Sequence, residues 1–411
     1  MQYLANLPFD LNLLPQPVYV VGGAVRDELM GRVRAELDLD LVVAVGAVAV
    51  ARELAQKYRA GFVLLDAERQ IARVVFPGMT VDIAQQDGDD IVSDLARRDY
   101  RLNAIAYDLQ RGALVDPLCG GQDIQDRTIR MVSRGNLVDD PLRLLRAYRQ
   151  GAQLDFTIEP TTRQAIQDLA HLTTTVAAER VLAELRYLLQ TPLSSRWLVG
   201  LVTDGLLAGW LDAPMPEGLA VKLGEIDRAI NIIGSNYPIL AIELDRPLRN
   251  TIAISRIGIS KLTAILSPEI GVATAQMLRL TFSSIEIQVV TTAIKYLPQL
   301  LQSEMSLVQQ YFWFQGVGSN FPLLLILAIA DGLEINNVIK LVDRYLDPND
   351  PVAHPTSLVT GHDLIEALQI PPSPQIGKLL TEIHLAKIRG EIATSDEAIE
   401  FARQLINVSS G

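Results

Sequence analysis

Short apolar runs alternate with helical patterns along the first part of the chain, whereas helical patterns alone fill the rest. Five runs rich in β-branched, aromatic and other apolar residues predict strands, at residues 17–21, 36–43, 61–65, 71–76 and 79–83. Residues 47–59 carry apolar positions at helical spacing and predict a helix between the second and third strands. The chain therefore begins with a mixed domain of strands and helices.

After Pro141 the strand pattern nearly disappears. Apolar residues at helical spacing predict helices over 142–154, 160–172 and 177–189, and the pattern continues toward the C-terminus. The fold class predicted from these patterns is α+β, with an N-terminal head followed by an all-helical remainder. Proline-containing breaks, which indicate joints between helical segments, fall near 191–192, 212–214 and 347–351.

The composition limits the class of protein. A chain of 411 residues is long enough for two or more domains, and 49% hydrophobic with 20% charged residues excludes wholesale disorder. The net charge of −12 argues against a general nucleic-acid binder. Arginines nevertheless cluster at 97–101 and 127–149, so a local basic face within an acidic whole stays open as a binding surface.

The single cysteine and the apolar runs bear on localisation. Cys119 cannot form an internal disulfide and lacks the partners of a zinc site, which fits a reducing compartment. The first residues lack the basic region of a secretory signal. The longest apolar run, 321–330, is too short to span a bilayer, which needs about 20 residues. We expect a cytoplasmic protein without a membrane partner.

A glycine turn follows the first predicted strand. Gly22 and Gly23 would let backbone N–H groups approach a phosphate closely, and Arg26 could add a charge-assisted hydrogen bond. Asp38 and Asp40 follow on the second strand, where residues two apart share one face. Two such carboxylates repel each other unless a cation lies between them, and Mg²⁺ takes oxygen ligands.

An alternative for this aspartate pair is an exposed strand edge, where charged residues improve solubility. Leu37, Leu39 and Leu41 would fill the opposite face of the same strand. The glycine turn, the arginine and the paired carboxylates together favour a metal–nucleotide site.

Two further segments concentrate arginines. Residues 94–106 combine three arginines with an aspartate and an asparagine, although a solvated helix start capped by Asp94 would explain part of this pattern. Arg143, Arg146 and Arg149 recur every three residues and would share roughly one helix face. Three like charges on one face repel unless an anion lies across them, and a triphosphate would serve.

Together these motifs resemble the class II tRNA nucleotidyltransferases, which share a head with bacterial poly(A) polymerases. The matching segments, in chain order, are GGAVRDELMG with DLD, RRDYRLNAIA, DPLCGGQDI, DDPLRLLRAYR and ERVLAELRYLL, followed by residues 360–365 and 375–380 in the tail. The resemblance implies a polymerase-β-like nucleotidyltransferase head over 1–125, a helical neck over 126–190, a helical body over 191–346 and a helical tail over 347–411.

The resemblance also implies roles for individual residues. Asp38 and Asp40 would be the catalytic carboxylates and would hold two Mg²⁺ ions. The implied nucleotide-binding residues are Gly22, Gly23 and Arg26 on phosphates, Arg98 and Asn103 on sugar and phosphates, Asp140 and Arg143 on the base, and Arg146 and Arg149 on phosphate. Arg149 could instead pair with a residue of the neck. Asp82 either supports the metals or simply ends a strand. Arg180 and Glu184 would stabilise the packing of the neck helices rather than contact substrate.

The implied base-reading pair can be argued chemically. Cytosine and adenine both present an amine donor beside a ring-nitrogen acceptor, whereas uracil and guanine present a carbonyl acceptor beside a ring N–H. Asp140 only accepts hydrogen bonds and Arg143 only donates them, so the pair matches C and A. The implied substrates are therefore CTP, with ATP as a further candidate, and the 3′ end of tRNA, bound through its acceptor and T arms; DNA is not an expected partner.

This chain departs from the family pattern in two places. Asp139-Asp140 stands where relatives usually have Glu-Asp, and residues 83–93 are short and acidic where enzymes that build the full CCA end carry a longer basic loop. A shortened loop is associated with members that add only CC. A full CCA-adding enzyme, an A-adding enzyme and a poly(A) polymerase remain alternatives.

Two readings from other classes are disfavoured. A catalytically inactive RNA-binding protein would have no use for the intact aspartate pair Asp38 and Asp40. His362-Asp363 resembles part of a phosphohydrolase metal site, but no second such pair exists, so we predict an ordinary helix start there.

Overall fold

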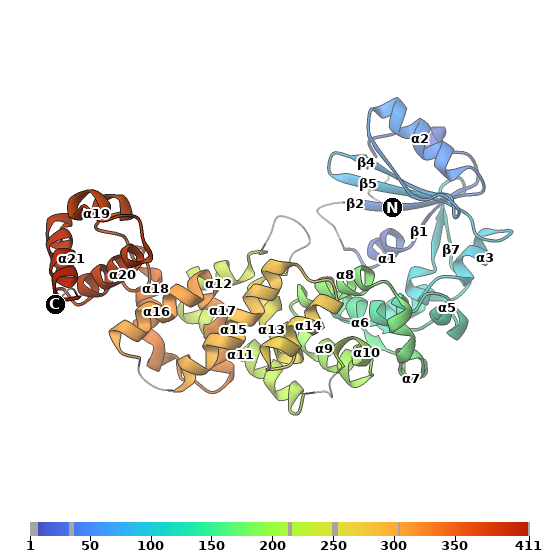
Figure 1. Ribbon diagram of the computed structural model, residues 1–411. Coiled ribbons are helices and arrows are strands. Elements are labelled where there is room, and N and C mark those ends of the chain that lie inside the picture. Colours follow the sequence, from blue (N-terminus) through green and yellow to red (C-terminus); the bar gives the residue numbers. More distant parts are fainter. Residues whose placement is uncertain (1–6, 33–36, 213–215, 249–253, 303–304, 410–411) are drawn as a thin grey trace. The chain divides into compact units, whose positions relative to one another are not determined.

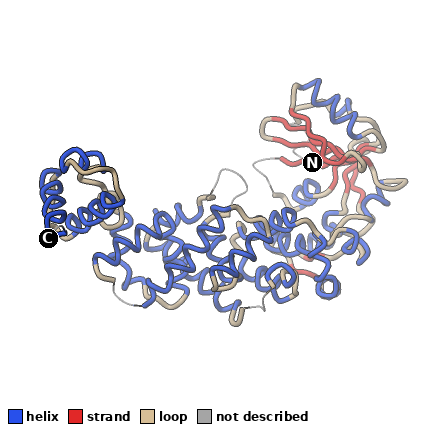
Figure 2. The backbone as a smooth tube through the Cα atoms, in the orientation of Figure 1, coloured by secondary structure: helices blue, strands red, loops and turns tan. Residues whose placement is uncertain are grey.

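The computed structural model describes residues 7–32, 37–212, 216–248, 254–302 and 305–409. The chain divides into two compact units, Met1–Met215 and Pro216–Gly411. The first unit holds a sheet and helices, and the described part of the second is helical (Figure 2). The predicted α+β class is therefore confirmed.

A seven-stranded sheet forms the head, in the order β3-β4-β5-β2-β1-β6-β7. The strands are β1 (Val18–Val21), β2 (Leu37–Val43), β3 (Gly61–Asp66), β4 (Ile71–Phe76), β5 (Met79–Gln85), β6 (Ala106–Asp108) and β7 (Ala113–Val115). All five predicted strands are confirmed, with residue 36 outside the described part. β2 pairs with β1 in antiparallel and with β5 in parallel orientation.

The position of β2 excludes one alternative from the sequence. Because this strand lies inside the sheet, the aspartates on it do not decorate a solvent-facing edge, and that interpretation is wrong. Leu39 and Leu41 are buried on one face of β2, which leaves Asp38 and Asp40 on the other. The side chain of Leu37 lies outside the described residues.

Helices cover the sheet and connect it to the neck (Figure 1). A short 3₁₀ helix (Leu11–Leu13) precedes β1, α1 (Gly23–Leu29) follows it and contacts β1 and β2, and α2 (Ala47–Tyr58) packs on β3, β4 and β5. α3 (Ile91–Ala96) begins at Asp90, whose side chain accepts from the Ser93 N–H, so the expected cap at Asp94 is wrong. The buried Asp94 lies inside this helix. A 3₁₀ turn (Arg101–Asn103) and α4 (Gly120–Gln125) complete the head.

The remaining elements of the first unit are mostly helical. They are β8 (Thr128–Ile129), α5 (Arg134–Asp139), α6 (Leu142–Leu154), β9 (Thr157–Ile158), α7 (Pro160–Leu169), a 3₁₀ helix (Ala170–Thr175), α8 (Ala178–Leu189), α9 (Ser194–Thr203) and α10 (Ala208–Leu211). The three helices predicted after Pro141 are confirmed as α6, α7 with its 3₁₀ extension, and α8. α6 contacts α8 and α9, and this packing fixes the helix face that carries the arginines.

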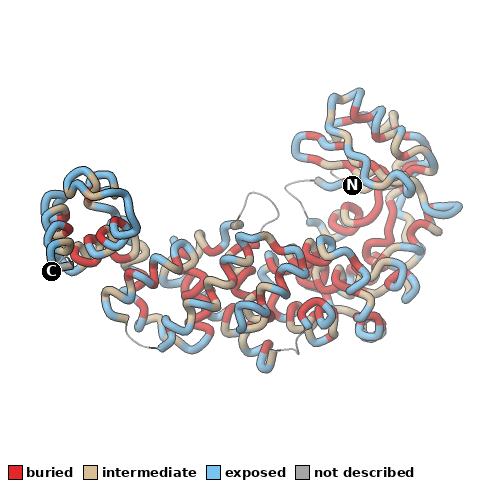
Figure 3. Tube along the Cα trace, in the orientation of Figure 1, coloured by how far each residue is buried: buried red, intermediate tan, exposed pale blue. Residues whose placement is uncertain are grey.

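The second unit packs its helices around α17 (Phe321–Ala330), whose residues are all buried. The others are α11 (Leu219–Asn236), α12 (Pro238–Asp245), α13 (Arg256–Ile265), α14 (Ile270–Arg279), α15 (Ser284–Gln302), α16 (Leu307–Val317), 3₁₀ helices at Gly318–Asn320 and Ile335–Val338, and α18 (Ile339–Leu346). Buried residues follow the inside of this unit (Figure 3). The stretch Leu307–Ala330 is long and apolar enough to cross a membrane by composition alone, but 67% of its most apolar window is buried inside the protein.

The C-terminal helices α19 (Gly361–Leu368), α20 (Pro374–Ile388) and α21 (Ser395–Ser409) enclose a hydrophobic cluster of their own, which includes Leu364, Ile383 and Ala402. Thr360 and Asp363 form a reciprocal capping box at the start of α19. The predicted ordinary helix start at His362-Asp363 is confirmed. The three domain boundaries expected from the sequence stay predictions.

Candidate active site

The end of β1 brings the glycine turn against the paired carboxylates. Val21 lies opposite Asp40 in the β1–β2 register, and Gly22 follows with φ 71°. A Cβ at Gly22 would lie 3.1 Å from Asp40 Oδ2 and 3.4 Å from Arg98 Nη1. Only glycine combines this left-handed backbone with so close an approach. The turn therefore places backbone beside a carboxylate and a guanidinium.

Asp40 is a buried carboxylate on this face of the sheet. Its pKa is raised to about 6, chiefly by burial; the negative charges of Asp82 and Asp38 also raise it, and the positive charge of Arg98 lowers it. Asp82 lies inside β5 in register with Asp40, not at the end of the strand, and receives two hydrogen bonds of 2.7 and 2.8 Å from Arg73. Burial is thus the main reason why the charged form of Asp40 is disfavoured at this site.

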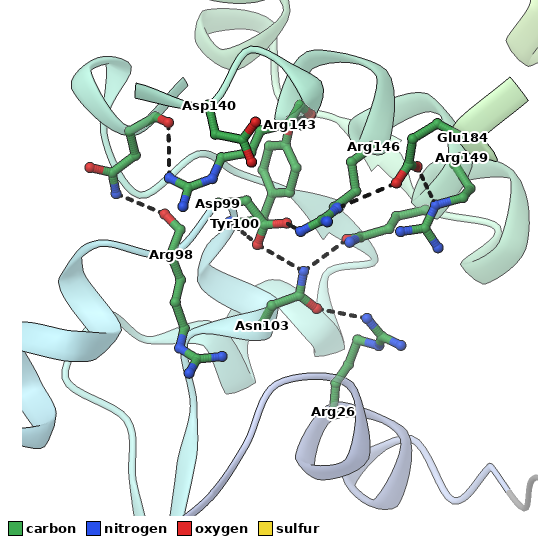
Figure 4. A network of polar contacts seen from close by, with 12 residues as sticks. Arg26, Arg98, Asp99, Tyr100, Asn103, Asp140, Arg143, Arg146, Arg149 and Glu184 are labelled. Carbon is green, nitrogen blue, oxygen red and sulfur yellow. Dashed lines mark hydrogen bonds and ion pairs between the residues drawn. The ribbon is translucent and has the colours of Figure 1, made fainter. Parts of the chain in front are cut away.

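Asn103 is the centre of a buried polar network (Figure 4). Its side-chain amide donates to Asp99 and to Gln150, both at 3.0 Å, and its carbonyl accepts from Arg26 at 2.6 Å. Arg26 also pairs with Asp27 at 2.9 Å. These contacts join the head to α6 and fix the orientation of the Asn103 side chain.

Two of the three arginines on α6 have carboxylate partners within the protein. Arg146 lies 3.2 Å from Asp99 and 3.7 Å from Glu184, and Arg149 pairs with Glu184. Burial raises the pKa of Asp99, but the positive charge of Arg146 and hydrogen bonds from Asn103 and Tyr100 outweigh it and hold that pKa below its usual range. The expectation that only an anionic ligand relieves this charge is corrected: Asp99 and Glu184 relieve part of it.

Asp140 and Arg143 frame the start of α6. Asp140 pairs with Arg180 at 3.1 Å, and Arg143 donates to the carbonyl of Asn136 at 2.9 Å. The hydroxyl of Tyr100 donates to the carbonyl of Arg143 at 2.6 Å and ties this turn to the head. Arg180 therefore contacts the predicted base-reading residue, whereas Glu184 contacts the arginines.

A cavity of about 430 Å³ lies between the glycine turn and α6. It is lined by all predicted site residues except Asp38 and Asp140, namely Gly22, Gly23, Arg26, Asp40, Arg98, Asn103, Arg143, Arg146 and Arg149. Asp38 lines a neighbouring cavity of about 660 Å³ that shares Arg26 and Arg149 with the first. Asp99 and Gln150 also line the first cavity and were missed in the sequence; Gln150 directly follows Arg149, and no pattern marks it.

This arrangement suits the binding of a nucleoside triphosphate. Glycine backbone and several guanidinium groups surround a cavity with a carboxylate on its wall, and these groups bind phosphates and a bridging divalent cation. Together with the strand order of the head, the site defines a nucleotidyltransferase.

Comparisons with known proteins identify the family. Residues 18–130 match the poly A polymerase head domain, residues 155–217 a segment described as a probable RNA and SrmB-binding site of polymerase A, and residues 260–402 tRNA nucleotidyltransferase domain 2. The chain is 44% identical to the CC-adding tRNA nucleotidyltransferase of Synechocystis over 98% of both chains. It is 30% identical to the CC-adding enzyme of Geobacter sulfurreducens over 92% of this chain and 90% of that one. The chain therefore belongs to the tRNA nucleotidyltransferase family.

The solved structures agree with this fold. A CCA-adding enzyme in complex with CTP aligns with a TM-score of 0.70 at 23% identity, over 95% of this chain and 91% of that one. The predicted architecture of a nucleotidyltransferase head followed by helical domains is confirmed.

Proposed function

We propose that this enzyme adds two cytidines to the 3′ end of tRNA, using CTP and no nucleic-acid template. The observation that carries the proposal is the 44% identity to a CC-adding enzyme along nearly the whole length of both chains. We further propose that the reaction takes place in the cytoplasm, as the sequence led us to expect.

The connection between β5 and α3 supports CC addition. Residues 86–90 form a short link whose first two residues are held: the Gln86 N–H donates to the Val43 carbonyl at 2.8 Å, and the Asp87 N–H donates to Asp94 at 3.1 Å. Asp87 also pairs with Arg97. A link this short and internally bonded leaves no long basic loop to reorganise the site for a third nucleotide.

The carboxylates fit a divalent cation. Asp38 and Asp40 share a face of β2, and burial raises the pKa of Asp40 to about 6, so a bound cation would favour the charged form of this carboxylate. Among the described residues no three His, Cys, Asp or Glu side chains form a ready cation site. Mg²⁺ is commonly held by one or two carboxylates together with substrate phosphates, so these two aspartates are its proposed ligands. When bound, Mg²⁺ supplies neutralisation of the triphosphate and activation of the RNA 3′-hydroxyl.

The residues of the first cavity would position the triphosphate. Backbone N–H groups of the glycine turn and the guanidinium of Arg98 would hold phosphates beside Asp40, and Asn103, oriented by its network, would contact the sugar. The RNA 3′-oxygen then forms a bond to the α-phosphorus while the bond to pyrophosphate breaks. Catalysis would come from position and charge rather than from a covalent intermediate.

Asp140 and Arg143 would select the base. Asp140 accepts from Arg180, but a carboxylate has about four lone-pair sites, which leaves acceptors for the exocyclic amine of cytosine. Arg143 uses one N–H on the Asn136 carbonyl and keeps others for the ring nitrogen. The protein itself would therefore supply the hydrogen-bonding pattern of a template.

Incorporation of single nucleotides with Mg²⁺ tests the proposal. We expect CTP to be added to a tRNA transcript that lacks the CCA end, and no ATP to be added to one that ends in CC. Addition of A after CC would make the enzyme CCA-adding, or A-adding if CTP fails, and would overturn the proposed specificity.

A further inference from the structure

The second cavity lies beside the catalytic carboxylate that the first cavity does not contain. Asp38 lines the cavity of about 660 Å³, whereas Asp40, its neighbour on the same strand face, lines the cavity of about 430 Å³. The two cavities are adjacent, because both include Arg26 and Arg149. Ligand pockets in proteins commonly enclose roughly 300–1,000 Å³, so each cavity is large enough for a nucleotide.

The two cavities differ in what they offer a ligand. The second lacks the glycine turn, Arg98 and Arg143, which the first provides for a triphosphate and a base. A transferase of this kind must bring two substrates together at its carboxylates. The second cavity is therefore placed for the acceptor strand rather than for a second triphosphate.

Apart from Asp38, one charged side chain on the wall of the second cavity has no partner of opposite charge among the described residues. The same wall contains two ion pairs, Arg26 with Asp27 and Arg149 with Glu184, and within each pair the two opposite charges largely cancel. Arg32 remains: it is exposed, donates to the Gln153 carbonyl at 3.2 Å, and has no carboxylate partner among the described residues. A single unpaired guanidinium on this wall fits one phosphodiester group.

An aromatic ring lines the same cavity. Tyr187 on α8 is 39% exposed, and the guanidinium carbon of Arg149 lies 5.8 Å from its ring centroid. Glu184, which pairs with Arg149, lies one turn before Tyr187 on the same helix face. The ion pair thus holds a cation against the ring, and the ring is an exposed platform of the kind on which single-stranded bases stack.

We propose that the second cavity binds the 3′-terminal nucleotide of the RNA acceptor, with its base stacked on Tyr187 and its phosphate on Arg32. Its 3′-hydroxyl would then lie toward Asp38. This inference rests on the proposed function, because it assumes that RNA is the acceptor. Stacking is indifferent to base identity, which suits an acceptor that ends in different bases before and after the first addition.

The test combines a change in the protein with a matching change in the RNA. Tyr187→Ala and Tyr187→Phe are compared with the wild type on a tRNA transcript lacking the CCA end, and on the same transcript with an abasic 3′-terminal ribose. Leu114→Ala is the control, since Leu114 is 48% exposed in the same unit and lines neither cavity.

We expect Tyr187→Ala to raise KM for the RNA about fivefold to 150-fold, the range that loss of one base–aromatic stack supports, with KM for CTP unchanged. Tyr187→Phe and the control should behave as the wild type. With the abasic RNA, KM for the RNA should rise by a similar factor in the wild type. In Tyr187→Ala the abasic RNA should cause no further rise, because both changes remove the same contact. The comparison of intact and abasic RNA with wild-type protein needs no substitution, so its result does not depend on whether a variant folds.

Arg32→Gln tests the phosphate contact separately. Its RNA dissociation constant, measured without CTP, should depend less on salt, with the slope of log Kd against log salt reduced by roughly 0.7. The inference is overturned if Tyr187→Ala leaves KM for the RNA unchanged, if it raises KM for CTP instead, if the effects of the variant and the abasic RNA multiply, or if Arg32→Gln keeps the wild-type slope. The proposed function fails on a different result, namely that the wild type adds nothing to the unmodified tRNA.

Discussion

Replacing Arg143 by alanine should weaken the preference for CTP over UTP. Uracil would place a carbonyl oxygen against Asp140, which only accepts, and an N–H against Arg143, which only donates, so neither pair could form a hydrogen bond. Each unpaired buried group costs roughly 1–3 kcal/mol, and Arg143→Ala removes one of the two penalties. The ratio of kcat/KM for CTP to that for UTP should therefore fall by roughly fivefold to 150-fold.

The ratio is the correct readout because the substitution also has a structural cost. Arg143 donates to the Asn136 carbonyl at 2.9 Å, and loss of this bond should lower stability by about 1 kcal/mol. A loss of folded protein would reduce both activities equally and leave the ratio intact. Both nucleotides are measured by competition for one tRNA transcript lacking its CCA end. Arg134→Ala, which breaks an exposed pair with Asp168 outside both cavities, should keep the wild-type ratio. An active Arg143→Ala enzyme with an unchanged ratio would refute the pairing scheme.

Three further substitutions follow from the geometry. Asp204 accepts hydrogen bonds from Arg163 at 2.7 and 3.0 Å. Burial raises the pKa of Asp204, but its hydrogen bonds and the positive charge of Arg163 hold that pKa below the unfolded value of 3.8. The stabilisation that Asp204 gives to the fold is therefore present above pH 4 and lost as the pH falls below that value. Because the Arg163 side chain is 48% exposed and water can solvate it, Asp204→Asn should cost about 1–3 kcal/mol at pH 7 and flatten the acid side of a urea-unfolding profile. A profile that keeps its slope would contradict this. Asp40 has its pKa raised by burial from 3.8 to about 6, so the stabilisation it gives below pH 4 is lost as the pH rises through 6. Asp40→Asn should therefore abolish nucleotide addition yet stabilise the chelator-treated protein at pH 8 by up to about 3 kcal/mol in urea unfolding. A variant less stable than the wild type would show that burial of the charged Asp40 side chain has no such cost. Gly22→Ala would force a left-handed backbone on alanine and place Cβ 3.1 Å from Asp40 Oδ2 and 3.4 Å from Arg98 Nη1. We expect kcat/KM for CTP to drop on the order of 10–100-fold, with little change in the free energy of unfolding. Normal activity would mean that the turn can move.

Much of the fold could be predicted from the sequence because periodicity reports burial. Residues 142–154 carry their apolar positions at helical spacing, and α6 occupies that range. β6 and β7 escaped prediction because three-residue strands are too short to show alternation. The cap at Asp90 was missed for another reason: Asp90 and Asp94 are both suitable capping residues, and only the backbone conformation decides which one caps the helix.

Most of the predicted site residues lie together in the structure, but the contacts between them could not be predicted. The glycine turn, Arg98, Asn103 and the arginines of α6 all line one cavity because short motifs fix local geometry. The sequence did not reveal that Arg180 pairs with Asp140, a contact across 40 positions of chain. The sequence also did not predict that Asp38 and Asp40 line different cavities, because two residues on one strand face can contact different neighbouring segments. Such relations arise only from the packing of distant segments.

The burial of α17 has a consequence for synthesis of the chain. This helix is apolar on every side and contacts α11, α12, α13 and α15, all of which precede it in the sequence. Chains emerge from the ribosome N-terminus first, so these partners leave it before α17 does. These four helices can therefore begin to cover α17 as soon as it emerges, whereas Tyr345 of α18, which stacks on Phe321, follows later. A circular permutant that moved residues 321–330 ahead of α11 would lose this order, so its synthesis should yield more aggregate than synthesis of the natural chain.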